Sequence, residues 1–159
     1  CRTTPGRTGR VVALVNAEDV LVAGDLHGHL ANFRRLHDIA GYRLGVIANQ
    51  PTDVRRAMVR DGLTGYFEFL GVSDDLGIEK PDPRIFAHAV EVVGVPSSAC
   101  AMVGDRLDHD VRPARSAGMR AVWVLRGEAP ERPTPEQLAE PDACVRTLGD
   151  LPSALEAIA

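Results

Sequence analysis

The stretch MVGDRLDHDVRPARSAGMRAVWV (residues 102–124) indicates most directly how this chain folds. It starts within a short apolar run (99–105) that ends in Gly-Asp, and it continues through a short helical segment at about 110–117 before a second apolar run (119–125). Short apolar runs bounded by turn residues are typical of strands that are buried on both faces. A strand, a helix and another strand in succession predict a parallel sheet covered by helices.

The same alternation extends along most of the chain, so we predict the α/β class with a doubly wound parallel sheet. The first buried strand is predicted at 19–25, whereas 11–15 is predicted as a short strand or an edge strand outside the core. The Pro- and Glu-rich segment 127–141 is predicted as a surface loop. The other predicted elements are strands at 42–49, 66–73 and 143–148 and helices at 30–40, after Pro51, at 81–94 and at 151–159.

Composition excludes several classes of function. The 159 residues suffice for one domain with a proper core. The net charge of −4, from 18 basic and 22 acidic residues, argues against nucleic acid as a partner, because such binding needs a basic surface. No apolar run approaches the roughly 18 to 20 residues of a membrane span. Three cysteines without metal-ligand spacing fit a reducing compartment, so we expect a cytoplasmic protein without a membrane partner.

Two of the predicted strands end in the same dipeptide. Gly24-Asp25 ends the first predicted strand, and Gly104-Asp105 ends the fourth. In an open parallel sheet, ligands bind beyond the carboxyl ends of the strands, so Asp25 and Asp105 can converge on one cation. Oxygen ligands of this kind suit Mg²⁺, which is the metal cofactor that we expect.

Three stretches together resemble the haloacid dehalogenase-like (HAD) hydrolases. RLGVIANQ (43–50), LGIEKPDPRIF (76–86) and the opening stretch look like the second, third and fourth motifs of that family. The resemblance covers about residues 41–159, three quarters of the chain. It implies a HAD-like Rossmannoid core. The segment 26–42 is too short for the cap domain that family members usually insert, so a core without a cap is expected.

The resemblance also implies a mechanism and roles for particular residues. In the family, a carboxylate at the end of the first strand attacks phosphorus and forms an aspartyl-phosphate intermediate, while Mg²⁺ and a lysine neutralise the developing charge. Lys80 matches the catalytic and phosphate-binding lysine, Asp105 the metal-binding acid and Asp110 the residue that supports the metal site.

The chain departs from the family pattern at two motifs. Ala48 stands where a Ser or Thr usually holds the phosphate, and the side-chain amide of Asn49 is expected to substitute in part. The usual first motif, D-x-D-G-T-L, is matched in frame by DLHGHL (25–30). This frame makes Asp25 the nucleophile and a metal ligand. It places His27 at the acid/base position, where the residue also contributes to the metal site, through its backbone carbonyl.

Residues 19–36 have a second resemblance, to the first motif of calcineurin-like metallophosphoesterases, G-D-x-H-G. The later G-N-H-[DE] and G-H-x-H segments of that family do not occur in this chain. We therefore infer that two sequence segments of different origin could join near 36–41. The predicted domain organisation is a disordered segment at 1–10 followed by a single HAD-like domain at 11–159. The chain starts with Cys1, and a native, a truncated and a chimeric N-terminus are all compatible with the sequence.

The predicted function is that of a Mg²⁺-dependent HAD-like hydrolase of the phosphatase type, acting on a small phosphorylated molecule and weakened by its atypical first motif. One alternative is a catalytically inactive HAD-like domain with a binding or regulatory role. The other is a chimeric or truncated gene product. The substrate and the oligomeric state are not determined by the sequence.

Overall fold

The computed structural model describes residues 12–16 and 42–159. Its strands are β1 (Val12–Asn16), β2 (Arg43–Ala48), β3 (Phe67–Val72), β4 (Cys100–Gly104), β5 (Arg120–Val124) and β6 (Ala143–Val145). Its helices are α3 (Val54–Arg60), α4 (Ser73–Leu76), α5 (Pro83–Val93), α6 (Arg112–Ser116), α7 (Pro135–Leu138) and α8 (Leu151–Ile158). Short 3-10 turns occur at Thr64–Tyr66, Ser97–Ala99 and Leu148–Asp150, and a π-helical turn at Leu107–Val111 leads into α6.

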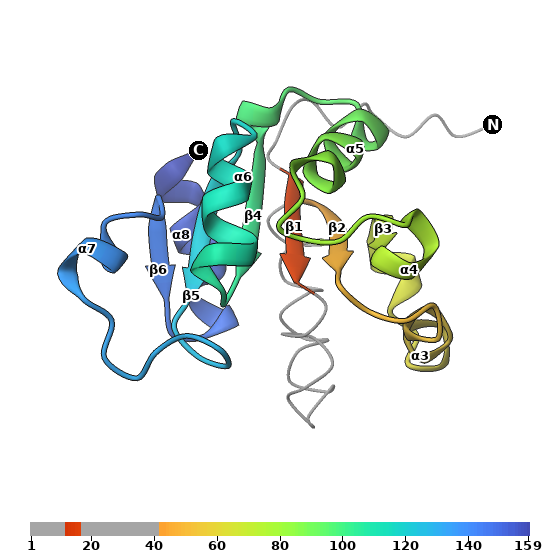
Figure 1. The fold of residues 1–159 in the computed structure, drawn as a ribbon, viewed down its shortest axis with the longest axis horizontal. Coiled ribbons are helices and arrows are strands. Elements are labelled where there is room, and N and C mark those ends of the chain that lie inside the picture. The colour runs from red at the N-terminus through yellow and green to blue at the C-terminus, as the bar shows by residue number, and fades with distance from the viewer. Residues whose placement is uncertain (1–11, 17–41) are drawn as a thin grey trace.

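The six strands form one parallel sheet in the order β3-β2-β1-β4-β5-β6 (Figure 1). The chain runs outward from β1 through β2 to β3, and then returns to the other side of β1 for β4, β5 and β6. The direction of winding therefore reverses between β1 and β4. In open α/β sheets such a switch point leaves a crevice beyond the carboxyl ends of the two strands, and ligands bind there.

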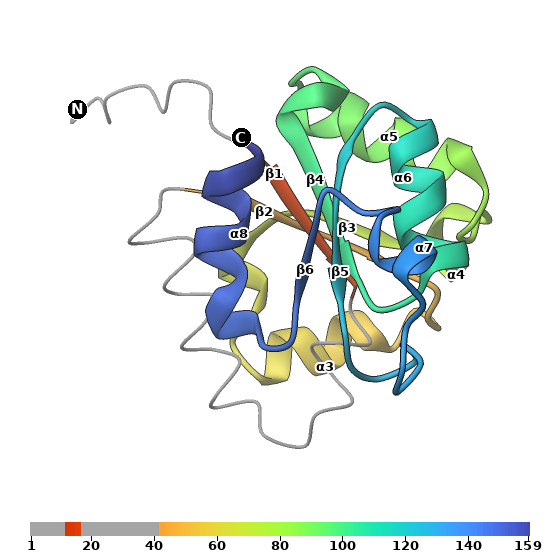
Figure 2. The same ribbon diagram turned by 90° about the vertical axis from the view of Figure 1, so that its left-hand side faces the viewer.

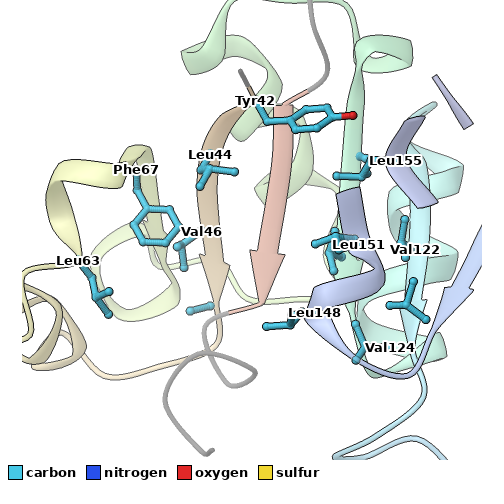
Figure 3. Close-up of a cluster of buried hydrophobic side chains, with 14 of the residues drawn as sticks. Tyr42, Leu44, Val46, Leu63, Phe67, Val122, Val124, Leu148, Leu151 and Leu155 are labelled. Atoms are coloured by element: carbon cyan, nitrogen blue, oxygen red, sulfur yellow. The ribbon is translucent and has the colours of Figure 1, made fainter. Parts of the chain in front are cut away.

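Helices cover both faces of the sheet, with α8 on one side and α5 and α6 on the other (Figure 2). The side chains of each strand alternate between the two faces, so that Leu44 and Val46 of β2 pack on the α8 face and Ile47 packs on the α5 face. The α8 face also buries Leu151 and Leu155 of α8 itself (Figure 3). The prediction of a doubly wound α/β fold is confirmed.

The N-terminal strand corrects part of the sequence prediction. Residues 11–15 were predicted as a short strand or as an edge strand outside the core. The short strand is confirmed as β1, but the edge position is wrong, because β1 pairs along its length with β2 on one side and with β4 on the other. Five largely apolar residues without a charge suit a central parallel strand, because such a strand is buried on both faces. The place expected for 19–25 is thus filled by β1. Residues 19–25, with Asp25, and His27 after them lie outside the described residues.

The later strands and helices follow the predicted order, with three differences. Helix α4 was not predicted, and β6 ends at Val145 although a strand was predicted over 143–148. The predicted loop at 127–141 contains the short helix α7, which begins in a capping box: Gln137 N donates to Thr134 Oγ1 (3.3 Å) and Thr134 N donates to Gln137 Oε1 (2.9 Å). The capping pair of Thr134 and Gln137 was not recognised in the sequence, because the Pro- and Glu-rich composition of this segment favours a loop.

Only α4 and α5 lie between β3 and Ser97, so this part of the described chain holds no cap domain. The segment 26–41, the N-terminal segment 1–10 and the possible join at 36–41 lie outside the described residues. Within the ranges that the structure describes, no helix is long and apolar enough to cross a membrane.

Candidate functional site

Polar residues follow three neighbouring strands at the carboxyl edge of the sheet. Asn16 is the last residue of β1, Asn49 follows β2 and Asp105 follows β4. The register places these ends nearly level, since Asn16 pairs with Ile47 on β2 and Val15 pairs with Val103 on β4. The ends of the strands that carry Asn16, Asn49 and Asp105 therefore lie at or next to the switch point between β1 and β4.

A buried ion pair connects the loop before α5 with the turn after β4. Lys80 Nζ lies 2.6 Å from Asp110 Oδ1, and both side chains are almost completely buried. The second carboxylate oxygen of Asp110 accepts a hydrogen bond from Arg106 N at 3.1 Å. Lys80 is the one lysine among the 18 basic residues of the chain. A compact ammonium group fits this enclosed position, where a planar guanidinium would need more room and more acceptors.

The absence of a side chain at Gly104 leaves room for the Asp110 carboxylate. A Cβ atom at residue 104 would lie 2.4 Å from Asp110 Cγ, well inside any allowed contact. The Gly-Asp dipeptide at the end of β4 thus has two separate uses. The glycine admits Asp110, and the aspartate that follows it, Asp105, lies at the edge of the sheet.

The Asn49 side chain holds the backbone of Lys80. Asn49 Oδ1 accepts from Lys80 N at 2.7 Å, and Asn49 Nδ2 donates to Lys80 O at 2.8 Å. Asn49 was predicted to contact phosphate. In the structure its amide binds the backbone of Lys80. Phosphate binding by Asn49 stays a prediction.

Asp105 is buried and is held from the side of β5. Its Oδ2 accepts from Glu128 N at 2.8 Å, and its backbone carbonyl accepts from Trp123 Nε1, also at 2.8 Å. Gly127, in the left-handed region at φ 63°, brings the backbone against this carboxylate, since a Cβ there would lie 2.2 Å from Oδ2. A cavity of about 360 Å³ adjoins Asp105 and is also lined by Arg112.

Ser73, which was not among the predicted site residues, connects the ends of β2 and β3. Its buried hydroxyl accepts from Gln50 N at 3.1 Å and donates to Gln50 O at 3.3 Å. A serine beside two aspartates after a strand gives no distinctive signal, because its partner is 23 residues away in the sequence.

The outer residues of the turn after β4 pair with one another. Asp108 lies 3.1 Å from Arg106 Nη2 and 2.9 Å from His109 Nδ1, and all three side chains are at least a quarter exposed. The hydrogen bond from Arg106, with a smaller contribution from His109, lowers the pKa of Asp108 to about 2. Asp108 and His109 therefore belong to the surface of this turn.

The described residues supply only part of a metal site. Across these residues, no three His, Cys, Asp or Glu side chains are grouped closely enough to hold a metal ion. Both oxygens of the Asp110 carboxylate already have partners, Lys80 Nζ and Arg106 N. Asp105 is therefore the candidate metal ligand at the switch point. Mg²⁺ is commonly bound through one or two carboxylates, several waters and substrate phosphate, so one carboxylate fits that ion.

Lys80, Asn49, Asp105 and Asp110 were all predicted as site residues. The structure brings Lys80 into contact with Asp110 and with Asn49, and it places Asp105 at the same sheet edge. Asp25 and His27 lie outside the described residues. Asn16, at the end of β1, is a further candidate that the sequence prediction did not include. Asn16 and Glu18 come at the end of an apolar run and are two residues apart, as Asp25 and His27 are.

Comparison with known proteins agrees with this fold. A sequence model of the HAD-hydrolase-like family matches residues 77–151. A HAD phosphatase from Thermococcus onnurineus superposes with a TM-score of 0.69 at 35% identity, covering 79% of this chain and 55% of that one. The chain belongs to the HAD-like hydrolase superfamily.

Several curated relatives of this HAD-like chain are named as phosphatases. It is 45% identical over 112 residues to a phosphoserine phosphatase of Thermus thermophilus, covering 70% of this chain and 42% of that protein. It is 37% identical to a glyceraldehyde 3-phosphate phosphatase of Pyrococcus abyssi, covering 59% of this chain and 40% of the relative. The chain thus spans about two fifths of the length of these relatives.

Proposed function

We propose that this HAD-like domain binds the phosphate group of a small phosphorylated molecule together with Mg²⁺ and hydrolyses the ester slowly. The buried pair of Lys80 and Asp110 carries the proposal, because it fixes the single lysine of the chain beside the carboxyl edge of the sheet. A fixed ammonium group in a protected site stabilises the charge that develops on a phosphoryl group. The phosphatase relatives support the same substrate class.

Asp105 would hold the Mg²⁺, and Asp25 and the backbone carbonyl of His27 stay its further predicted ligands. The ion supplies positive charge next to the phosphate when it is bound. Asp105 is oriented by Glu128 N and adjoins a cavity, which supports a ligand role. We expect Asp105→Asn to weaken Mg²⁺ binding at least ~10-fold, by analogy with lost charge at other oxygen-ligand sites.

Isothermal titration calorimetry with MgCl₂ measures this effect. Asp108→Asn is the matched control, because it removes an equal charge from the exposed side of the same turn. Equal affinities for the wild type and Asp105→Asn would remove Asp105 from the site. A loss in Asp108→Asn as large as that in Asp105→Asn would reduce the effect to general electrostatics.

The identity of the nucleophile decides how fast hydrolysis can be. An aspartyl-phosphate intermediate requires a carboxylate at the end of the first strand, and Asp25 is the residue predicted for this role. The first strand of the sheet is β1, which ends at Asn16, between β2 and β4. A carboxamide is no nucleophile for phosphorus. Glu18, two residues later, keeps an acid in the following position.

This observation also favours a second function, a HAD-like domain that binds a phosphorylated ligand without turning it over. The absence of a hydroxyl at Ala48 supports the same conclusion, since a phosphate contact expected of the family is missing. Binding and slow hydrolysis differ only in whether a carboxylate reaches phosphorus, so one substitution can distinguish them.

The experiment is steady-state hydrolysis of a small aryl phosphate with Mg²⁺ at neutral pH. We expect very low wild-type turnover and a gain of at least ~100-fold in Asn16→Asp, because loss of a nucleophile typically costs more than that. The Asp25→Asn variant is the comparison. If wild-type turnover is robust and is abolished in Asp25→Asn, then Asp25 is the nucleophile and the assignment of β1 to this role is wrong.

A further inference from the structure

Lys80 is held from both ends by groups that lie far from it in the sequence. Its ammonium group contacts Asp110 at 2.6 Å, and its backbone N–H and carbonyl are both bound by the Asn49 side chain. Asn49 is separated from Lys80 by 31 residues and follows β2 directly. The loop that carries Lys80 is thus fastened to the sheet at the residue whose side chain enters the site.

The two bonds from Asn49 restrict Lys80 in a particular way. An asparagine amide that accepts from a backbone N–H and donates to the carbonyl of the same residue imitates a neighbouring strand, and it fixes both the position and the rotation of that peptide unit. Glu79 and Pro81, on either side, are exposed, whereas Lys80 is buried. Residue 80 is therefore the point at which an exposed loop turns inward, and Asn49 contacts it there.

We infer that Asn49 is a positioning residue that sets the site through the backbone of Lys80, and not a direct phosphate ligand. The inference rests on the proposed function only in the experiment that measures phosphate binding. A site group must be held to within about 0.5 Å of its working position, and packing and hydrogen bonds around that group provide the constraint. Asn49 provides it for the backbone, and Asp110 provides it for the ammonium group.

The first test measures Lys80 directly and needs no ligand. Because Lys80 is the only lysine, an acylating reagent followed by peptide mass spectrometry reports on this one side chain, with the N-terminal amine as an internal reference. We expect Lys80 to be slow to react in the wild type and ~10-fold faster in Asn49→Ala, the effect of losing one to two net hydrogen bonds. Asn49→Asp keeps the acceptor for Lys80 N and should fall between the two.

A matched control separates positioning from general loosening. Val145→Ala shortens a buried side chain on β6, remote from β2, and lowers global stability without touching Asn49. Labelling of Lys80 should stay close to the wild-type rate in this variant. Equal acceleration in Val145→Ala and Asn49→Ala would overturn the inference, and so would unchanged labelling in Asn49→Ala.

The second test distinguishes positioning from direct contact by a double-mutant cycle on inorganic phosphate binding. Lys80→Gln retains a donor for Asp110. We expect Asn49→Ala to weaken phosphate binding ~10-fold with Lys80 present and to have little further effect in Lys80→Gln, because coupled residues are not additive. Equal losses in both backgrounds would make Asn49 a direct ligand and overturn the inference. If the wild type does not bind phosphate, the proposed function fails, while the labelling result still decides the role of Asn49.

Discussion

The two sides of the turn after β4 carry similar residues and treat them differently. On the inner side, Asp105 and Asp110 are 3% and 0% exposed and are bound by backbone N–H groups and by Lys80. On the outer side, Asp108 is an exposed carboxylate that pairs with Arg106 and His109. The three acids are the same residue type, so the contrast shows that burial and the bonds of each carboxylate separate the two inner acids from the outer one.

The largest expected effect comes from breaking the buried ion pair between Lys80 and Asp110. Asp110→Ala leaves the Lys80 ammonium buried without a partner, so the free energy of unfolding should fall by ~3–5 kcal/mol. Urea unfolding followed by circular dichroism measures it. Asp108→Ala, on the outer side, should change the same quantity by less than ~1 kcal/mol. Similar losses in the two variants would erase the distinction between the sides.

A smaller effect should follow from filling the space beside Asp110. Gly104→Ala places a methyl group against the Asp110 carboxylate, and overpacking of this kind typically costs ~1–3 kcal/mol. Gly65→Ala is the matched control, because nothing lies within 4 Å of a Cβ added there. Thermal unfolding of both variants compares them. If Gly104→Ala unfolds at the same temperature as the control, then Asp110 can move without loss of stability, and its position in the ion pair with Lys80 is not fixed.

The smallest effect concerns the outer side and depends on pH. The pKa of Asp108 is lowered from 3.8 to about 2, so its ion pairs stabilise the fold above pH 4 and stop doing so as the pH falls from 4 to about 2. The stability difference between the wild type and Asp108→Asn should therefore shrink over this interval. Because these groups are exposed, added salt should reduce the difference as well. A difference that stays constant between pH 5 and pH 2 would show that the pair is not formed in solution.

Most of the fold could be predicted because the apolar runs of β2, β4 and β5 each stand alone between turn residues. The N-terminal strand could not, because two apolar runs, 11–15 and 19–25, lie four residues apart and periodicity does not rank them. The Gly-Asp ending favoured the second run. Pairing with β2 and β4, which depends on residues far along the chain, selects the first.

The candidate site shows the same limit. Lys80, Asp105 and Asp110 stand in motifs whose spacing is visible in the sequence, and the structure places all three at or beside the carboxyl edge. The partnership of Asn49 with Lys80 and that of Ser73 with Gln50 join residues 31 and 23 positions apart. Such hydrogen bonds depend on how the strand ends meet, and a local pattern does not encode that.

The central place of β1 has a consequence for how the chain folds during synthesis. Val12 pairs with Arg43 on one side and with Cys100 on the other, so β1 leaves the ribosome long before its second neighbour exists. Pairings so distant in sequence carry a large loop-closure entropy and form late. Until β4 is made, β1 and β2 present an unpaired strand edge, which is the kind of surface that invites association with other chains. Chains that are released before residue 100 should therefore aggregate. In chains that are completed, β4 pairs with β1 and removes the unpaired edge.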